Sequence, residues 1–195
     1  MHLALFDFDG TVTTRDSMLE FIRFAGGPAR VIFGMGALWP LGGLYLMNGI
    51  SSQKFTELLM RFFFRGVAQE RVQELGEAFA RSRLPRLVRP RALDRIRWHQ
   101  ENGHRVVVVS ASFDVWLQPW CEEDKLELLA SRFEIRKGRV TGRFDGEECS
   151  GAEKVRRIRA FLNLQDYSRI YAYGDSPSDK PMLELAHESY FGKVD

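Results

Sequence analysis

The start of the chain most constrains the fold, because a short apolar run there passes directly into two aspartates. Residues 2–9 read HLALFDFD, and their apolar part fits a buried β-strand. Asp7 and Asp9 stand one residue apart, so an extended backbone directs both side chains over the same edge of a sheet. Like charges this close raise each other's proton affinity. The pair therefore predicts either a cation between the two carboxylates or a proton held on one of them.

Segments with strand patterns alternate with helical segments along the rest of the chain. Further strands are predicted at 104–110, where a β-branched run is unbroken, at 168–176 and at 188–194. Helices are predicted at 90–103 and 151–164, a short helix contains Pro181, and 132–144 fits a β-hairpin turning at Lys137 and Gly138. This alternation predicts an α/β fold with a doubly wound parallel sheet and a small β-hairpin.

The interval between the first two strands is too long for a simple crossover. Within it, residues 18–27, 51–66 and 68–83 are helical in character. The chain has 195 residues, of which 45% are hydrophobic, and this suits one compact core with a smaller insertion. We therefore expect a core formed by residues 1–13 and 88–195, with residues 14–87 inserted as an α-helical cap.

Polar side chains end three of the predicted strands. Asp7 and Asp9 follow the first strand, Ser110 ends the second, Asp175 ends the strand at 168–176, and Lys154 lies on the helix before that last strand. Ligands of doubly wound sheets gather at the carboxyl ends of the strands, so these side chains should meet. Mg²⁺ prefers hard oxygen ligands and often a substrate phosphate, and Asp7 and Asp175 could hold it through their side chains.

This set of residue types predicts phosphoryl transfer through an aspartyl intermediate. Asp7 would attack phosphorus as a carboxylate nucleophile. Asp9 would protonate the leaving oxygen and then deprotonate the water that cleaves the intermediate. Ser110 would donate a hydrogen bond to a phosphoryl oxygen, Lys154 would balance its charge, and Gly10 would allow close backbone approach.

Four motifs in this order resemble those of the haloacid dehalogenase-like superfamily of phosphatases. They are DFDGT at 7–11, the strand-end serine of VVVVSAS, the lysine of GAEKVRRI, and GDSPSD at 174–179. The position of the insertion is similar to that of the helical cap in the phosphoserine phosphatase-like branch, subfamily IB. The resemblance spans nearly the whole chain and implies the same α/β core.

The resemblance also implies roles for individual residues. It assigns the nucleophile to Asp7 and the general acid and base to Asp9. It assigns magnesium to Asp7, to the backbone carbonyl of Asp9 and to Asp175. Asp179 would order the waters of the metal or the lysine, and Gly10 and Thr11 would support the first motif.

Departures from the family pattern bear on the substrate. Phosphoserine phosphatases usually have a glutamate nine residues after the nucleophile, which grips the substrate amine, and Asp16 stands there in this chain. Glycines usually follow the motif serine, where this chain has Ala111 and Ser112. In the cap, Arg61 or Arg65 could face the active site and bind a carboxylate or phosphate.

Two segments raise the question of a membrane surface. Residues 31–50 carry no charge and could form a buried cap hairpin, an exposed patch that dips into a membrane, or a span. A span conflicts with Pro40, with five glycines and with motifs of one site on both sides of it. Residues 81–97 contain seven arginines and one acid, which fits a solvated basic face or attraction to an anionic surface, either lipid headgroups or nucleic acid. The neighbouring apolar stretch favours lipid.

The overall charge and the N-terminus bear on partners and location. A net charge of +2 gives no bulk attraction to nucleic acid, and none is expected as a partner. The N-terminus lacks the basic and apolar regions of a secretory signal. We expect a cytoplasmic protein, with the cap as the point of any peripheral contact at the inner face of the membrane.

The sequence thus predicts a Mg²⁺-dependent phosphomonoesterase that acts through phospho-Asp7 on a small phosphorylated metabolite. One alternative is a lipid phosphate such as phosphatidylglycerophosphate, whose phosphatases in the superfamily have similarly apolar caps. An alternative of another class is a phospho-acceptor or binding module, since receiver domains also gather acids and a lysine at a sheet edge. Such domains have no long insertion after the first strand.

Overall fold

The computed structural model describes residues 1–27, 31, 34, 36, 47 and 49–192. Its centre is a parallel sheet of five strands in the order β3-β2-β1-β6-β7. The strands are β1 His2–Phe6, β2 Arg105–Phe113, β3 Glu127–Ser131, β6 Arg169–Gly174 and β7 Glu188–Phe191. The chain steps outward from β1 to β3 and then crosses to β6 on the other side of β1. The switch point of the sheet therefore lies between β1 and β6, where ligands of this fold bind.

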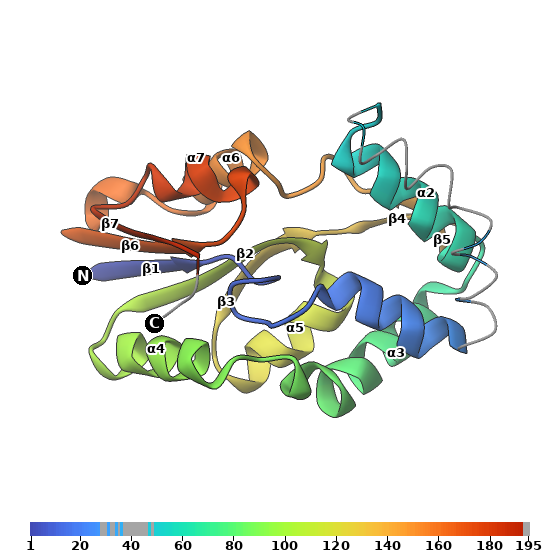
Figure 1. The fold of residues 1–195 in the computed structure, drawn as a ribbon, viewed down its shortest axis with the longest axis horizontal. Coiled ribbons are helices and arrows are strands. Elements are labelled where there is room, and N and C mark those ends of the chain that lie inside the picture. The colour runs from blue at the N-terminus through green and yellow to red at the C-terminus, as the bar shows by residue number, and fades with distance from the viewer. Residues whose placement is uncertain (28–30, 32–33, 35, 37–46, 48, 193–195) are drawn as a thin grey trace.

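Helices cover both faces of the sheet, as Figure 1 shows. They are α4 Pro90–Glu101 and α5 Asp114–Glu123 on one face, with α6 Ala152–Phe161 and α7 Lys180–Leu183 on the other. The alternation of β1 explains both layers: Ala4 and Phe6 belong to the core cluster that includes Ile96 of α4, and Leu3 and Leu5 belong to the one that includes Ile158 of α6. This confirms the doubly wound α/β fold.

The segment between β1 and β2 adds a helical layer beyond the sheet edge. It contains a helix over residues 17–27, then α2 Ser52–Phe64, α3 Gln69–Ser82 and the 3₁₀ turn Leu84–Arg86. Its two connections to the core run side by side, because Thr13 and Val88 form an antiparallel bridge. The division of the chain into a core and a cap at 14–87 remains a prediction, although its boundaries coincide with this bridge.

The hairpin β4 Phe133–Arg136 and β5 Arg139–Phe144 extends the helical layer (Figure 1). It turns at Lys137 and Gly138, as predicted, and both have positive φ. Helix α2 packs on β5 so closely that a Cβ at Gly142 would overlap the backbone of Arg61. The hairpin thus anchors α2 over the carboxyl edge of the sheet.

The sequence patterns found most elements and missed two. Helix α5 and strand β3 were not predicted: α5 contains Pro119, and β3 is a short edge strand with only two buried residues. The short 3₁₀ turns Leu164–Asp166 and Pro177–Asp179 complete the described elements. The apolar stretch at 31–50 lies largely outside the described residues. Among the helices that the structure describes, none is long and apolar enough to cross a membrane.

Candidate active site

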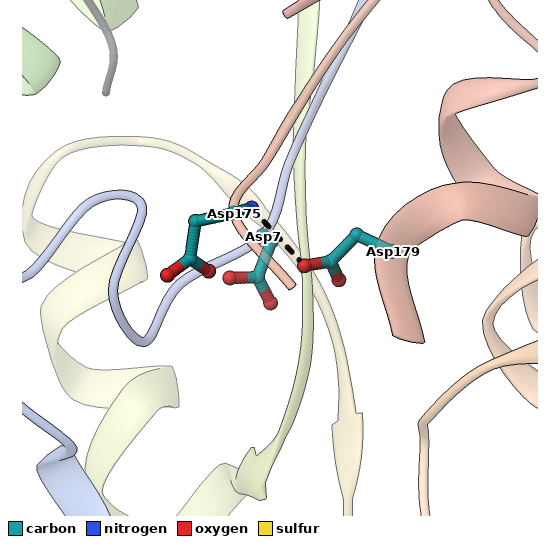
Figure 2. Close-up of side chains that lie close together, drawn as sticks. All are labelled: Asp7, Asp175 and Asp179. Carbon is teal, nitrogen blue, oxygen red and sulfur yellow. Dashed lines mark hydrogen bonds between the residues drawn. The ribbon is translucent and has the colours of Figure 1, made fainter. Parts of the chain in front are cut away.

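Three carboxylates meet at the switch point of the sheet (Figure 2). Asp7 follows β1, Asp175 follows β6, and Asp179 ends the 3₁₀ turn after β6. One carboxylate oxygen from each lies within 4.8 Å of the others. Asp179 Oδ2 accepts hydrogen bonds from the backbone N–H groups of Asp175 at 3.2 Å and Ser176 at 2.9 Å. These bonds fold the GDSPSD segment back on itself, so that two of its aspartates face Asp7.

Lys154 of α6 lies buried between two of these carboxylates. Its Nζ donates to Asp7 Oδ1 at 2.6 Å and to Asp179 Oδ1 at 2.7 Å, and the side chain is only 1% exposed. Burial opposes the lysine charge, but the attraction of Asp7 and Asp179 outweighs it and holds the lysine pKa above its ordinary value. The sequence therefore placed Lys154 in the same cluster as the structure does.

Asp7 keeps a second oxygen for other contacts. Its Oδ2 accepts from Thr11 Oγ1 at 3.0 Å, and the same hydroxyl lies 3.3 Å from Asp175 Oδ1. Burial raises the pKa of Asp7 to about 6 against the pull of Lys154. Burial, with the repulsion of Asp179, also raises the pKa of Asp175. A cation between Asp7 and Asp175 would relieve both effects.

The donor set fits a hard divalent cation such as Mg²⁺. Asp179 is already committed to Lys154 and Ser176, which leaves Asp7 and Asp175 as the side chains with oxygens to offer. Gly10 allows the DFDGT motif to lie close to Asp175, because its φ is +86° and a Cβ there would overlap the Asp175 carboxylate. The carboxylate of Asp9 is not part of this group, and a role for its backbone carbonyl stays a prediction.

Asp9 instead faces the N-terminus of the helix at 17–27. Its Oδ1 accepts from the Ser17 backbone N–H and its Oδ2 from Ser112 Oγ, both at 2.6 Å. Burial raises the pKa of Asp9 to about 7, and repulsion from Asp16 adds to this. Trp116 Nε1 donates a hydrogen bond to Ser17 Oγ at 3.1 Å. A carboxyl group in these surroundings can hold a proton near neutral pH.

Ser110 and Ser112 lie near the carboxyl end of β2, and Ser112 contacts the Asp9 carboxylate. Ser110 is buried, and its Oγ accepts from the Ser112 backbone N–H at 3.0 Å. Sequence reasoning noted Ser112 only as a departure from glycine. Its hydrogen bond to Asp9 makes it part of the site. In the sequence, the one indication of this was that Ser112 lies two residues beyond Ser110 on the same strand.

A cavity of about 270 Å³ opens beside Asp9. Its core side is formed by Asp9, Ala111 and Ser112, and α2 contributes Ser52, Phe55 and Thr56. The predicted residues Asp16 and Ala111 therefore both line a space next to Asp9. Glu148, on the loop before α6, also lines it and was not singled out by the sequence, because it matches no motif.

Arg61 does not line this cavity, which corrects the expectation that it faces the active site. It borders a separate hollow of about 350 Å³ between α2 and the hairpin, as does Arg65. Arg61 lies five residues beyond Thr56 on α2, so its side chain is turned by about 140° from the side that borders the cavity. The other arginines of this hollow come from the hairpin and are Arg136, Arg139 and Arg143.

Arg89 is a further residue that sequence reasoning missed. Its guanidinium donates to the carbonyl oxygens of Gly10 at 3.2 Å and Thr13 at 3.0 Å. It therefore ties the loop after Asp9 to the start of α4. Arg89 belongs to the arginine-rich stretch at 81–97, which was interpreted as a solvated basic face or as a segment attracted to an anionic surface, and neither interpretation singles out one arginine.

Comparisons with known proteins show the family to which the chain belongs. The sequence pattern of the haloacid dehalogenase-like hydrolases matches residues 4–184. Protein CicA of Caulobacter vibrioides is 34% identical over 188 residues, which cover 95% of this chain and 83% of that protein. A phosphoserine phosphatase of Archaeoglobus fulgidus is 27% identical over 197 residues, covering 94% of this chain and half of that protein. A Bordetella pertussis protein of unknown function has a solved structure that is 26% identical, with a TM-score of 0.83 over 96% of this chain and 88% of its own.

The chain belongs to the haloacid dehalogenase-like hydrolases. Within them it is related to the phosphoserine phosphatases, and it is an enzyme of the phosphatase type. This confirms the resemblance drawn from the four motifs. It also argues against the phospho-acceptor or binding module that the acidic cluster alone left open.

Proposed function

We propose that the protein is a Mg²⁺-dependent phosphomonoesterase that acts through a phosphoaspartate on Asp7. The observation that carries this proposal is the buried contact of Lys154 with both Asp7 and Asp179, with Asp175 beside them. This arrangement holds Asp7 at the switch point of the sheet and balances its charge with one fixed cation. Magnesium, when held by Asp7 and Asp175, would neutralise charge on the phosphoryl group.

The chain's own residues account for both chemical steps. A carboxylate oxygen of Asp7 forms a bond to phosphorus as the bond from phosphorus to the ester oxygen breaks. Asp9 gives its proton to that leaving oxygen, and the alcohol departs. Asp9 then takes a proton from water, whose oxygen attacks phosphorus and releases inorganic phosphate and free Asp7. The raised pKa of Asp9, about 7, supports this exchange near neutral pH.

The insertion at 14–87 is proposed to act as the cap that selects the substrate. Ser52, Phe55 and Thr56 of α2 border the cavity beside Asp9, which supports this role. The volume of about 270 Å³ favours a small phosphorylated metabolite. Closure of such a cap would exclude water while the phosphoaspartate forms.

The decisive test compares the wild type with Asp7→Asn. Hydrolysis of p-nitrophenyl phosphate should require Mg²⁺ in the wild type and vanish in the variant, while circular dichroism stays unchanged because Lys154 keeps Asp179. Fluoroberyllate should compete with the ester. Retention of turnover by Asp7→Asn would exclude the aspartyl route.

A lipid phosphate is a second candidate, supported by the arginine hollow. Five arginines and Glu134 border that hollow, and three of the arginines come from the exposed hairpin. An anionic membrane surface would attract such a group and bring the cap to the lipid. Flotation with vesicles that contain phosphatidylglycerol tests this: protein that stays at the bottom of the gradient at low salt excludes it.

A further inference from the structure

The cavity beside Asp9 is where the leaving group of the substrate must lie. A general acid has to reach the ester oxygen within hydrogen-bond distance, so the alcohol part begins at Asp9. Asp9 and Ser112 of the core and Thr56 of α2 all border the cavity. The chemistry of the remaining wall therefore decides which alcohol can bind.

That wall is acidic and includes a carboxylate with one oxygen free to accept a hydrogen bond from a ligand. Glu148 is 8% exposed, and its Oε1 accepts only long hydrogen bonds, from Ser52 at 3.3 Å and Thr56 at 3.4 Å. Its Oε2 accepts no hydrogen bond from any residue that the structure describes, and the side chain borders the cavity. No buried side-chain nitrogen or oxygen of the described residues lacks a hydrogen-bond partner, so Oε2 is open to the cavity and can accept a hydrogen bond from a ligand there.

The charges around the cavity all have the same sign. Asp16 and Glu148 border it together with Asp9, and no lysine or arginine does so among the described residues. Burial raises the pKa of both Asp16 and Glu148, as expected where no neighbouring cation compensates them. Met18, Leu19 and Phe55 supply apolar surface between the acids. A short chain that ends in an ammonium group matches both features.

We propose that the cavity selects phosphate monoesters of small amino alcohols, with Glu148 as a specificity-determining residue that binds the ammonium group. This inference rests on the proposed phosphomonoesterase function. It separates the protein from an enzyme for phosphoamino acids, because a carboxylate on the substrate would face Asp16 and Glu148 without a cation. Arg61, the expected partner for such a carboxylate, lies in the separate hollow instead.

Three esters test the proposal on the wild-type protein with Mg²⁺. They are phosphoethanolamine, propyl phosphate, in which a methyl group replaces the ammonium, and phosphoserine, which adds a carboxylate. The kcat/KM for phosphoethanolamine should exceed each of the others by about tenfold or more, the effect of one hydrogen bond to a charged group. Equal or better hydrolysis of propyl phosphate or phosphoserine would overturn the proposal.

A matched pair of variants assigns the selectivity to Glu148. Glu148→Gln keeps the size and an acceptor for Ser52 and Thr56 but removes the charge, whereas Glu147→Gln removes the same charge from the exposed neighbour. The ratio of kcat/KM for phosphoethanolamine to that for propyl phosphate should fall about tenfold in the first variant and stay unchanged in the second. A ratio unaffected by Glu148→Gln overturns the assignment.

The controls separate this inference from the proposed function. If p-nitrophenyl phosphate is hydrolysed only with Mg²⁺ but the three esters do not differ, the selectivity fails and the phosphomonoesterase stands. If no ester is hydrolysed with Mg²⁺, the proposed function itself fails. Inhibition of p-nitrophenyl phosphate hydrolysis by ethanolamine but not by propanol gives a readout on the wild type alone, and equal inhibition by both contradicts ammonium binding.

Discussion

Lys154 Nζ lies 2.6 Å from Asp7 Oδ1, so the proposed nucleophile is paired with a lysine that is almost completely buried. The two residues are 147 positions apart in the sequence, and the pair joins α6 to the end of the central strand. The same ammonium group reaches Asp179 at 2.7 Å. One lysine therefore holds together both ends of the site and offsets two buried negative charges.

Replacing Lys154 by methionine should lower the free energy of unfolding and stop turnover. The change leaves Asp7 and Asp179 buried without their cation, which typically costs about 3–5 kcal/mol. Urea denaturation measures the loss in unfolding free energy, and p-nitrophenyl phosphate measures activity. Lys180→Met, at an exposed position, is the control and should change neither quantity by much. A Lys154→Met protein as stable as the wild type would contradict the buried pair.

Replacing Asp175 by asparagine should raise the Mg²⁺ concentration needed for half-maximal activity. Asp175 is the more exposed partner of Asp7 and keeps carboxylate oxygens for a cation, whereas Asp179 is bound to Lys154 and Ser176. Loss of one negative ligand should raise that concentration by about tenfold or more, and EDTA should abolish activity in every variant. Titration of activity with MgCl₂ measures this. Asp145→Asn, at an exposed acid, should leave the titration unchanged, and an unchanged Asp175→Asn curve would exclude Asp175 as a ligand.

Replacing Gly10 by alanine should lower activity by more than its effect on stability explains. The new Cβ would overlap the Asp175 carboxylate, and the backbone of the alanine would have to adopt a φ of +86°. Gly138→Ala is a matched control, since its φ is +70° but a Cβ there meets no atom within 4 Å. Both variants should lose about 1–2 kcal/mol of unfolding free energy from backbone strain, and only Gly10→Ala should lose turnover. Equal activity of the two variants would contradict the close approach of Gly10 to Asp175.

Local patterns in the sequence predicted the parts of the site that lie at strand ends. Asp7, Ser110 and Asp175 end apolar runs, so parallel pairing alone brings them to one edge of the sheet. Lys154 followed from the helical spacing of its neighbours. The parallel, doubly wound class of the sheet followed from the alternation of strands and helices, whereas the strand order did not, because β3 and α5 were not predicted.

The missed parts depend on tertiary contacts that leave no local pattern. Glu148 lies in a loop, and only the packing of α2 on the hairpin brings it to the cavity. Arg89 resembles its arginine-rich neighbours until the structure shows its contacts with Gly10 and Thr13. Arg61 was expected at the active site because an arginine of the cap can bind a carboxylate or phosphate, but the direction of a side chain on α2 depends on which face of the helix meets the hairpin.

A buried histidine should make the fold sensitive to acid. His99 is fully buried on α4, with Nδ1 2.8 Å from His104 Nδ1 and Nε2 3.0 Å from the Tyr173 hydroxyl. Burial, with the nearby charge of a protonated His104, lowers the pKa of His99 to about 3. Because the folded pKa is depressed below the ordinary 6.5, the neutral form favours folding above pH 6.5. This stability is lost as the pH falls from 6.5 toward 3, by about 1.4 kcal/mol per pH unit for one group.

Urea denaturation between pH 7.5 and 4.5 measures this slope, and His99→Gln tests its origin. Glutamine can keep a hydrogen bond to Tyr173 but does not titrate, so the variant should lose stability at pH 7.5 and show a shallower decline toward pH 4.5. His187→Gln serves as the control, because His187 lies in the turn before β7, away from this cluster. It should keep the wild-type slope. If His99→Gln declines as steeply as the wild type, the acid sensitivity arises from other groups, because carboxylates bound in the folded state also lose stability as the pH falls.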